Sequence, residues 1–318
     1  MPVLVTFAAW KSTISQMIRG ICADRVCIVT GAGGGIGRQH ALVLAEQGAA
    51  VVVNDVGASL DGNGASIGAA QAVVDEIVGL GGRAVANTSD IASWTGAQEL
   101  INQAVDTFGD LHVLVNNAGI LRDRALVNMT EDDWDSVIRV HLKGAFACSR
   151  WAATYWRERT KAGVVNDARI VNTTSGSGLF GNVGQSNYGA AKAGIAGLTI
   201  IAAMELERYG VTVNAISPIA LTRMTQGLAL TQGDETEQAK VDPRWVAVLT
   251  SWLASSQSAG VTGRVFQVSG RVWAVAQGWH RGPAALPVED PADVDGVIRA
   301  LLADALPNAG AGGIYPEF

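Results

Sequence analysis

The sequence predicts an α/β protein: a single domain built on a Rossmann-type, doubly wound parallel sheet of about seven strands, with a C-terminal extension. Three observations support this. Short apolar, β-branched runs alternate with helix-like segments along most of the chain. A glycine-rich turn, GAGGGIG at residues 31–37, directly follows the first run. An acid, Asp55, closes the second run about 20 residues beyond that turn.

The first unit is a strand, a turn, a helix and a second strand. Residues 26–29 are apolar and β-branched, as in a strand buried on both faces of a parallel sheet. The helix is expected to begin near Ile36 and to end at Gly48, a residue type that readily takes the left-handed conformation beyond a helix C-terminus. The second strand is expected at residues 50–53.

The same alternation continues through the rest of the domain. Further strands are expected at residues 83–87, 111–119, 168–175, 211–217 and 263–270. Further helices are expected at residues 66–80, 95–108, 131–159, 186–209 and 243–253. Thr130 and Asp133 have the spacing of a capping box at the start of the helix expected at residues 131–159. Doubly wound sheets bind ligands at the carboxyl ends of their strands, so the site is expected there.

The chain of 318 residues is long enough for one large α/β domain, expected at residues 21–270. Residues 1–20 form an N-terminal extension, and 1–16 are either poorly packed or an arm for a partner or membrane. Residues 57–68 form either a surface excursion or a flap beside the ligand. The extension at 271–318 contains a helix-like stretch and is expected to pack on the domain or at a subunit interface.

Composition excludes several classes of function. A net charge of −6 without basic clusters argues against nucleic acid as a main partner. Three widely spaced cysteines, Cys22, Cys27 and Cys148, suit a reducing compartment, so a cytoplasmic location is expected. Neither they nor the four scattered histidines have metal-ligand spacing, so no metal is expected. No apolar run reaches the roughly 18 residues of a membrane span, so stable insertion is not expected.

The glycine spacing narrows the ligand. The pattern G-x-G-x-x-G does not fit, because Ile36 stands where the third glycine would be needed, whereas T-G-x-x-x-G-x-G fits at Thr30, Gly31, Gly35 and Gly37. Such glycines let the backbone approach a pyrophosphate at a helix N-terminus, and an acid at position 55 can accept both hydroxyls of an adenosine ribose. The simpler alternative is a tight turn without a ligand.

Three residues form the candidate catalytic set. Tyr188 and Lys192 are four positions apart in an expected helix, so they share a face. An ammonium beside a phenol favours phenolate, which would lower the phenol pKa and allow proton exchange with an alcohol. Ser175, at the end of a strand, can donate a hydrogen bond to the same substrate oxygen. Taken alone, a tyrosine and a lysine at this spacing are more often a solvated helix face.

Together these motifs resemble the short-chain dehydrogenase/reductase family over about residues 24–270. The resemblance implies a nicotinamide dinucleotide as cofactor and Ser175, Tyr188 and Lys192 as catalytic residues. It also implies cofactor contacts at Gly31, Gly35, Ile36, Gly37, Asp55, Asp90, Ile91, Asn117, Ala118, Gly119, Tyr188, Lys192, Pro218, Ile219 and Thr222.

One position departs from the family pattern. Members usually carry an asparagine in the long helix about 25 residues after the segment NNAG, as a fourth catalytic residue, and this chain has His141 in its place. A neutral imidazole could hold a water next to Lys192 or pass on a proton. Alternatively, His141 only packs at a kink of the helix.

Longer segments resemble one branch of the family. Stretches such as NNAGILRDRALVNMTEDDWDSVIRVHLKGAF and GNVGQSNYGAAKAG resemble the (3R)-hydroxyacyl-CoA dehydrogenase domain of peroxisomal multifunctional enzyme type 2, the 17β-hydroxysteroid dehydrogenase type 4 group. The resemblance implies oxidation of a 3-hydroxyacyl-CoA to the 3-oxoacyl-CoA in fatty-acid or sterol side-chain β-oxidation. The alternatives are a dehydrogenase of free hydroxysteroids, a 3-oxoacyl reductase and a non-catalytic dinucleotide-binding regulator.

Two further expectations concern the cofactor and assembly. Asp55 should repel a 2′-phosphate, and position 34, often basic in relatives that prefer NADP, is Gly34, so NAD is expected. The helices at 131–159 and 186–209 carry more apolar residues than one face needs, which predicts a homodimer or homotetramer with a small-molecule substrate (acyl-CoA or steroid). The residues behind this expectation are Phe146, Trp151, Ile195, Leu198 and Ile201.

Overall fold

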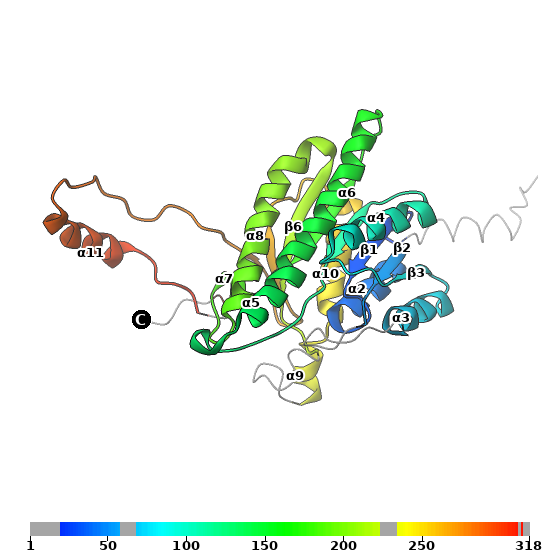
Figure 1. The fold of residues 1–318 in the computed structure, drawn as a ribbon, viewed down its shortest axis with the longest axis horizontal. Helices are drawn as coiled ribbons and strands as arrows, with labels where there is room; N and C mark the ends of the chain where they lie inside the picture. Colours follow the sequence, from blue (N-terminus) through cyan, green and yellow to red (C-terminus); the bar gives the residue numbers. More distant parts are fainter. Residues whose placement is uncertain (1–19, 58–67, 223–233, 311–312, 314–318) are drawn as a thin grey trace, which may run out of the picture.

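A single eight-stranded sheet forms the centre of the molecule, with helices on both faces (Figure 1). The computed structural model describes residues 20–57, 68–222, 234–310 and 313. The expectations for residues 1–16 and for most of the loop at 57–68 therefore lie outside the described residues. The doubly wound fold expected from the sequence is confirmed, with one strand more than the seven expected.

The strands coincide closely with the expected runs. They are β1 (Val26–Thr30), β2 (Ala50–Asn54), β3 (Arg83–Asn87), β4 (Val113–Asn116), β5 (Ala168–Thr173), β6 (Val211–Pro218), β7 (Val265–Val268) and β8 (Trp273–Ala276). Every residue of β1, β2, β4 and β5 is buried, because helices cover both faces of the sheet.

The strand order is β3-β2-β1-β4-β5-β6-β7-β8, so the chain reverses its direction of winding between β1 and β4. Strand β1 pairs in parallel with β2 on one side and with β4 on the other. The loops after β1 and β4 leave the sheet in opposite directions, which opens a crevice at their carboxyl ends. The glycine turn and the NNAG segment begin at this point.

Three helices cover each face of the sheet. Helices α2 (Gly35–Glu46), α3 (Gly68–Gly79) and α10 (Arg244–Ala254) contribute to one buried cluster, and α4 (Trp94–Phe108), α6 (Gly144–Lys161) and α8 (Ser186–Leu206) contribute to the other. Shorter helices lie between them in the chain, namely α5 (Glu131–Ile138), α7 (Gly176–Leu179) and α9 (Glu235–Ala239), and α11 (Val294–Asp304) follows the last strand. Thr130 and Asp133 form the expected capping box at the start of α5.

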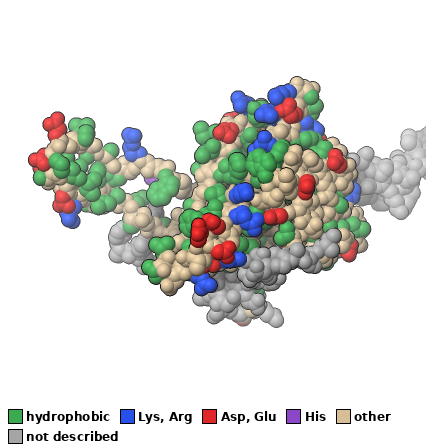
Figure 2. All heavy atoms as spheres, in the orientation of Figure 1, with side chains coloured by type: hydrophobic (Ala, Val, Ile, Leu, Met, Phe, Trp, Pro, Cys, Tyr) green, Lys and Arg blue, Asp and Glu red, His purple; other side chains and the backbone are tan. Residues whose placement is uncertain are grey.

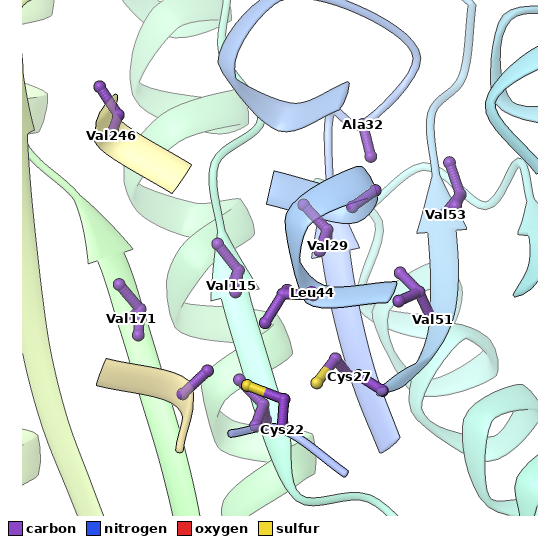
Figure 3. Packing of buried hydrophobic residues seen from close by; sticks show 14 of the residues in the cluster. Cys22, Cys27, Val29, Ala32, Leu44, Val51, Val53, Val115, Val171 and Val246 are labelled. Atoms are coloured by element: carbon purple, nitrogen blue, oxygen red, sulfur yellow. The ribbon is translucent and has the colours of Figure 1, made fainter. Parts of the chain in front are cut away.

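Two apolar cores follow from this layering. Figure 3 shows part of the first, where Leu44 of α2 and Val246 of α10 lie over strand residues such as Val29 and Val115. The second contains Trp156 of α6, which is fully buried and donates its indole N–H to the carbonyl oxygen of Leu111 at 2.7 Å. Because the sheet is covered on both faces, its carboxyl edge is left for ligands.

The expected helix at 131–159 is not continuous. It is divided into α5 and α6 by a π-helical turn, Arg139–Lys143, in which the amide of Gly144 bonds the carbonyl oxygen of Arg139, five residues back. The wider turn shifts the register of the side chains that follow and places His141 in the interior. Turns of this kind are frequent at functional sites.

The eighth strand is a difference from the expectation for the C-terminal extension. After β7, the chain turns at Ser269, whose amide bonds the carbonyl oxygen of Val272, and β8 returns antiparallel to β7. Helix α11 lies beyond it, away from the body of the molecule (Figure 1), and none of its residues is buried. The sequence predicted the helix. It did not predict the pairing of β8 with β7, because this hairpin has only four residues in each strand.

One helix of the described residues is long and apolar enough to cross a membrane by length and composition, namely residues 186–209, with a mean hydropathy of 1.4. This segment contains α8, which lies against β5, β6 and α7 in the fold. A helix that is covered by a sheet on one side has an apolar composition for that reason.

Candidate active site

The glycine turn between β1 and α2 has the conformation that its sequence requires. Gly31 and Gly35 have φ values of +63° and +53°, in the left-handed region that glycine readily adopts. A Cβ atom on Gly37 would overlap the carbonyl oxygen of Gly31, and one on Gly31 would lie 2.6 Å from the Cα atom of Ala118. Helix α2 begins with no side-chain cap, so the amide groups of its first turn are open to a ligand.

Asp55 lies beside this turn, at the carboxyl end of β2. Its two carboxylate oxygens accept hydrogen bonds from the amides of Gly33, at 2.8 Å, and Gly57, at 2.7 Å. The side chain is only partly buried. The carboxylate is therefore held in place at the outer end of the glycine turn, where the ribose of a dinucleotide is expected.

The loop after β4 is bound to the end of β1 by Thr30. Its hydroxyl accepts hydrogen bonds from the amides of Asn117, at 3.0 Å, and Ala118, at 3.1 Å. The side-chain amide of Asn117 donates in return to the carbonyl oxygens of Thr30 and Gly31. Gly119 follows, and its lack of a side chain leaves room for the ring of His141, which a Cβ atom would overlap.

Asp90 and Ile91 lie in the loop after β3. One carboxylate oxygen of Asp90 accepts from the amide of Ala92 at 2.9 Å, and the other pairs with the guanidinium of Arg139 at 3.0 Å. The Ile91 side chain is buried against the π-helical turn, where a Cβ atom on Gly144 would lie 2.7 Å from its Cδ1 atom. The loop that carries these two expected cofactor residues is thus in direct contact with the turn that carries His141.

Pro218, Ile219 and Thr222 close the opposite side of the crevice. Pro218 ends β6, and the amide of Ile219 donates to the carbonyl oxygen of Val268 in β7 at 2.9 Å. Thr222 reaches over the glycine turn, since a Cβ atom on Gly35 would lie 3.6 Å from its methyl carbon. The expected cofactor residues therefore lie in the loops at the carboxyl edge of the sheet, and the glycine turn, the uncapped helix N-terminus and the fixed Asp55 carboxylate fit a dinucleotide.

Ser175, Tyr188 and Lys192 lie together at the end of this crevice. Ser175 follows β5, and its hydroxyl acts on the half-buried Tyr188, whose pKa it lowers. The Lys192 ammonium lies 5.5 Å from the centroid of the Tyr188 ring, as expected for residues four apart on one helix. Its Nζ donates to the carbonyl oxygen of Thr173 at 2.7 Å, so the buried lysine binds α8 to the end of β5.

The electrostatics differ from the expected lowering of the Tyr188 pKa by Lys192. Burial raises the pKa of Tyr188, the hydrogen bond with Ser175 lowers it, and the negative charge of Asp123 raises it further. Burial also lowers the pKa of Lys192 to about 7, because a low-dielectric interior disfavours the ammonium. Near neutral pH the lysine is thus charged only part of the time, and its effect on the phenol is weakened.

His141 packs against Tyr188. The two rings meet edge to face with centroids 5.2 Å apart, and Nε2 lies 3.0 Å from the amide nitrogen and 2.8 Å from the carbonyl oxygen of Ile120. Burial, together with the charge of Lys192, lowers the pKa of His141 to about 3, so the ring is neutral at physiological pH. Its Nδ1 atom has no hydrogen-bond partner among the described residues.

Sequence reasoning missed two polar residues next to the group of Ser175, Tyr188 and Lys192, namely Gln185 and Asp123. Gln185 precedes α8 and contacts both Asp123 and Ser177, which belong to the loops after β4 and β5. Gln185 lies three positions before the candidate catalytic Tyr188, so its place in the sequence could have pointed to it. In the described part of the chain, no three His, Cys, Asp or Glu side chains gather as metal ligands would.

The doubly wound sheet and the group at its carboxyl edge define an α/β protein of the Rossmann class. Residues 25–233 match the family model described as short chain dehydrogenase, and the chain belongs to this family of oxidoreductases. It is 47% identical over 257 residues to the hydroxyacyl-CoA dehydrogenase ChsB1 of Mycobacterium tuberculosis, covering 78% of each chain. It is 42% identical over 262 residues to the mouse peroxisomal multifunctional enzyme type 2, covering 82% of this chain but only 34% of the mouse protein.

A solved structure gives the same result. The crystal structure of a short chain dehydrogenase from Mycobacterium avium superposes with a TM-score of 0.82 at 51% sequence identity. It covers 94% of this chain and all of its own. The part of this chain that the match leaves uncovered is shorter than the segment beyond Gly270. The match therefore continues into the C-terminal extension. The expected resemblance to the family and to its hydroxyacyl-CoA dehydrogenase branch is confirmed.

The buried neutral His141 predicts a specific loss of stability in acid. The pKa of His141 is about 3 in the folded protein, whereas the ordinary pKa of a histidine is 6.5. Between these two pH values the unfolded chain therefore binds a proton at His141 that the folded protein does not bind. The free energy of unfolding should fall by up to about 1.4 kcal/mol per pH unit for this group as pH decreases through that range.

We expect His141→Asn to give a shallower dependence of the unfolding free energy on pH, measured by urea denaturation between pH 4 and about 7. The exposed His280 provides the control, and His280→Asn should leave the slope of the wild-type protein unchanged. Equal slopes for His141→Asn and the wild type would show that His141 takes up a proton in the fold.

Proposed function

We propose that this protein is an NAD-dependent dehydrogenase that converts a secondary alcohol to a ketone, with a (3R)-hydroxyacyl-CoA as substrate. The observation that carries the proposal is the group of Ser175, Tyr188 and Lys192 at the end of a crevice shaped for a dinucleotide. The name of the Mycobacterium tuberculosis relative supports the substrate class. A regulator that only binds the dinucleotide would have no need of this proton-exchanging group.

In this proposal the protein handles the proton of the reaction. Ser175 and Tyr188 both bind the substrate hydroxyl, and the deprotonated phenol of Tyr188 takes its proton. Lys192, held by the carbonyl oxygen of Thr173, lies where it can exchange a proton with its surroundings, since its pKa is about 7. The nicotinamide, when bound, would supply the acceptor for the hydride that leaves the substrate carbon bearing this hydroxyl.

His141 has a supporting role in the proposal. Its Nε2 is engaged with the backbone of Ile120, which fixes the ring, and Nδ1 remains available for a water next to Lys192. A neutral ring suits this role, because it can hold a water without adding a charge beside the ammonium. The π-helical turn places the ring there.

Side-by-side turnover assays test the substrate. The panel is a series of (3R)-hydroxyacyl-CoA thioesters of different length, a 3-oxoacyl thioester for the reverse direction, and a free 17β-hydroxysteroid, each with NAD(H) and NADP(H). Higher kcat/KM with a hydroxyacyl-CoA and NAD supports the proposal. Higher kcat/KM with the free steroid, or with the 3-oxoacyl substrate and NADPH, contradicts it in favour of the corresponding alternative.

Removing the phenol oxygen of Tyr188 should abolish catalysis while leaving cofactor binding intact. Tyr188→Phe is expected to reduce kcat by at least about 100-fold, the lower end of the range for general acid–base catalysis. NADH affinity, measured by fluorescence titration, should stay near that of the wild type. His141→Ala should reduce kcat less, and His141→Asn less again. Turnover at the wild-type rate in Tyr188→Phe would place the chemistry elsewhere.

Asp55 predicts a preference for NAD over NADP. Its carboxylate is fixed by two backbone amides beside the glycine turn, where it can bind ribose hydroxyls and repel a 2′-phosphate. Asp55→Asn should lower kcat/KM with NAD and raise the ratio of NADP to NAD efficiency. The exposed Asp75, on α3, gives the matched control, and Asp75→Asn should keep the wild-type ratio. Equal or better efficiency of the wild type with NADP would contradict the prediction.

We also propose that the protein assembles as a homodimer or a larger homo-oligomer through the outer surface of α6 and α8. Phe146, Ile200, Ile201 and Met204 on these helices are between 45% and 75% exposed, and Figure 2 shows apolar side chains over this region. Of the residues expected on this surface, Ile195 is instead buried within the subunit. The adjoining Arg150 stacks on Trp94 and Trp151, the residue types that dominate binding interfaces.

The C-terminal extension supports assembly in the same proposal. Val294, Ile298 and Leu302 form an apolar stripe on α11 and are 42%, 46% and 68% exposed, and Figure 2 shows α11 away from the body. An apolar stripe of this kind suits a subunit contact. Location in the cytoplasm, also part of the proposal, agrees with three cysteines that are free and buried.

Light scattering at low micromolar concentration tests the assembly. The wild type is expected at about 66 kDa or more, at least twice the 33.0 kDa of the chain. Ile201→Lys should shift the protein toward monomer, because it places a charge on the apolar helix surface. Val78→Lys replaces a comparably exposed valine on α3 and should keep the wild-type mass. A fully active wild-type species of about 33 kDa would contradict the dimer.

A further inference from the structure

Gln185 joins the loop after β4, the short helix α7 and the turn before α8 beside the candidate active site. Its side-chain oxygen accepts hydrogen bonds from the hydroxyl of Ser177 at 2.7 Å and from the amide of Asn182 at 2.9 Å. Its side-chain nitrogen donates to the carboxylate of Asp123 at 2.8 Å. The amide of Arg124 donates to the carbonyl oxygen of Gly184 at 2.8 Å, which brings the backbones of the same loops together. The Gln185 side chain is thus held from both ends.

This contact extends to Ser175 through Ser177. The backbone amide of Ser177 donates to the Ser175 hydroxyl oxygen at 3.3 Å. An oxygen that accepts from this amide has its own proton free to point elsewhere, here toward Tyr188 and the substrate position. Because Gln185 binds the Ser177 side chain, it holds the turn that orients the catalytic hydroxyl.

Asp123 is held near the start of α8, because its carboxylate accepts from Gln185, which lies three residues before Tyr188. The titratable groups around the phenol come from three elements: Lys192 from its own helix, His141 from the π-helical turn, and Asp123 from the loop after β4. Burial keeps His141 neutral and lowers the pKa of Lys192 to about 7, whereas Asp123 lies on the exposed loop. Asp123 is therefore an anion whose charge acts on the phenol and raises its pKa.

We propose that Asp123 and Gln185 are positioning residues of the active site: Gln185 orients Ser175 through Ser177, and the charge of Asp123 sets the pH range in which Tyr188 can accept a proton. The proposal rests on the proposed dehydrogenase activity. The two effects are separable, because one depends on hydrogen-bond geometry and the other on charge.

Asp123→Asn tests the charge. An asparagine oxygen can still accept the hydrogen bond from Gln185, so the geometry is kept while the negative charge is lost. The pH midpoint of kcat/KM for alcohol oxidation should move to lower pH by about half a unit, the scale of a solvent-screened charge interaction. Asp135, an exposed acid on α5, provides the control, and Asp135→Asn should keep the wild-type midpoint. An identical midpoint in Asp123→Asn would overturn this part of the proposal.

Gln185→Leu tests the geometry. It removes the hydrogen bonds but keeps a side chain of similar size, and kcat should fall by about 10-fold, with little change in KM, because Ser175 is no longer oriented. In a Ser175→Ala background the same substitution should cause no further loss, since residues acting through one another are not additive. Equal reductions by Gln185→Leu in both backgrounds would show that it does not act through Ser175. A thermal-unfolding midpoint within a few degrees of the wild type shows that each variant has folded.

Titration of the phenol itself separates this proposal from the proposed function. The chain has four tyrosines, so the difference in phenolate absorbance between a protein and its Tyr188→Phe derivative reports on Tyr188 alone. Asp123→Asn should lower that midpoint even if none of the alcohols tested is a substrate. A lowered titration midpoint of Tyr188 without turnover would support the role of Asp123 and count against the proposed substrate. Turnover with an unchanged midpoint would support the proposed substrate and contradict the role of Asp123.

Discussion

The hydroxyl of Thr30 connects the two strands on which the rest of the site depends. By accepting the amides of Asn117 and Ala118, it holds the loop after β4 against the glycine turn after β1. These are the strands between which the sheet order reverses. Together with the Asn117 side-chain amide, which binds the carbonyl oxygens of Thr30 and Gly31, this connection holds the Cα atom of Ala118 close to Gly31. The close approach, in turn, requires glycine at position 31.

From this point the crevice divides into two chemically different ends. At one end backbone amides hold a carboxylate, as Gly33 and Gly57 hold Asp55, and the side chain remains partly open to solvent. At the other end burial dominates. Lys192 and His141 are both nearly inaccessible, and for both, burial is the largest cause of a lowered pKa. Cofactor residues are thus positioned by hydrogen bonds, whereas the proposed proton-exchanging residues are controlled by desolvation.

Burial also explains why Lys192 affects the pKa of Tyr188 less than the spacing of the two residues suggests. An ammonium enclosed by protein is stabilised here by the carbonyl oxygen of Thr173, and burial limits the fraction of molecules in which it is charged. The phenol is then influenced by groups outside its own helix. Asp123 is one of these, and its loop is held beside the site by the Gln185 side chain and by the backbone hydrogen bond between Arg124 and Gly184.

The sequence by itself determined the alternation of strands and helices, the glycine turn, the capping box at Thr130 and the shared face of Tyr188 and Lys192. All of these depend on spacing within one element or between adjacent ones, and the geometry of a helix or strand converts such spacing directly into direction. Only the tertiary structure decided the π-helical turn at His141, the antiparallel β8 and the burial of Ile195. The same holds for the lowered pKa of Lys192 and the contacts of Gln185. These features depend on which distant segments meet and on how much water they exclude, and neither property is encoded in the periodicity of a single segment.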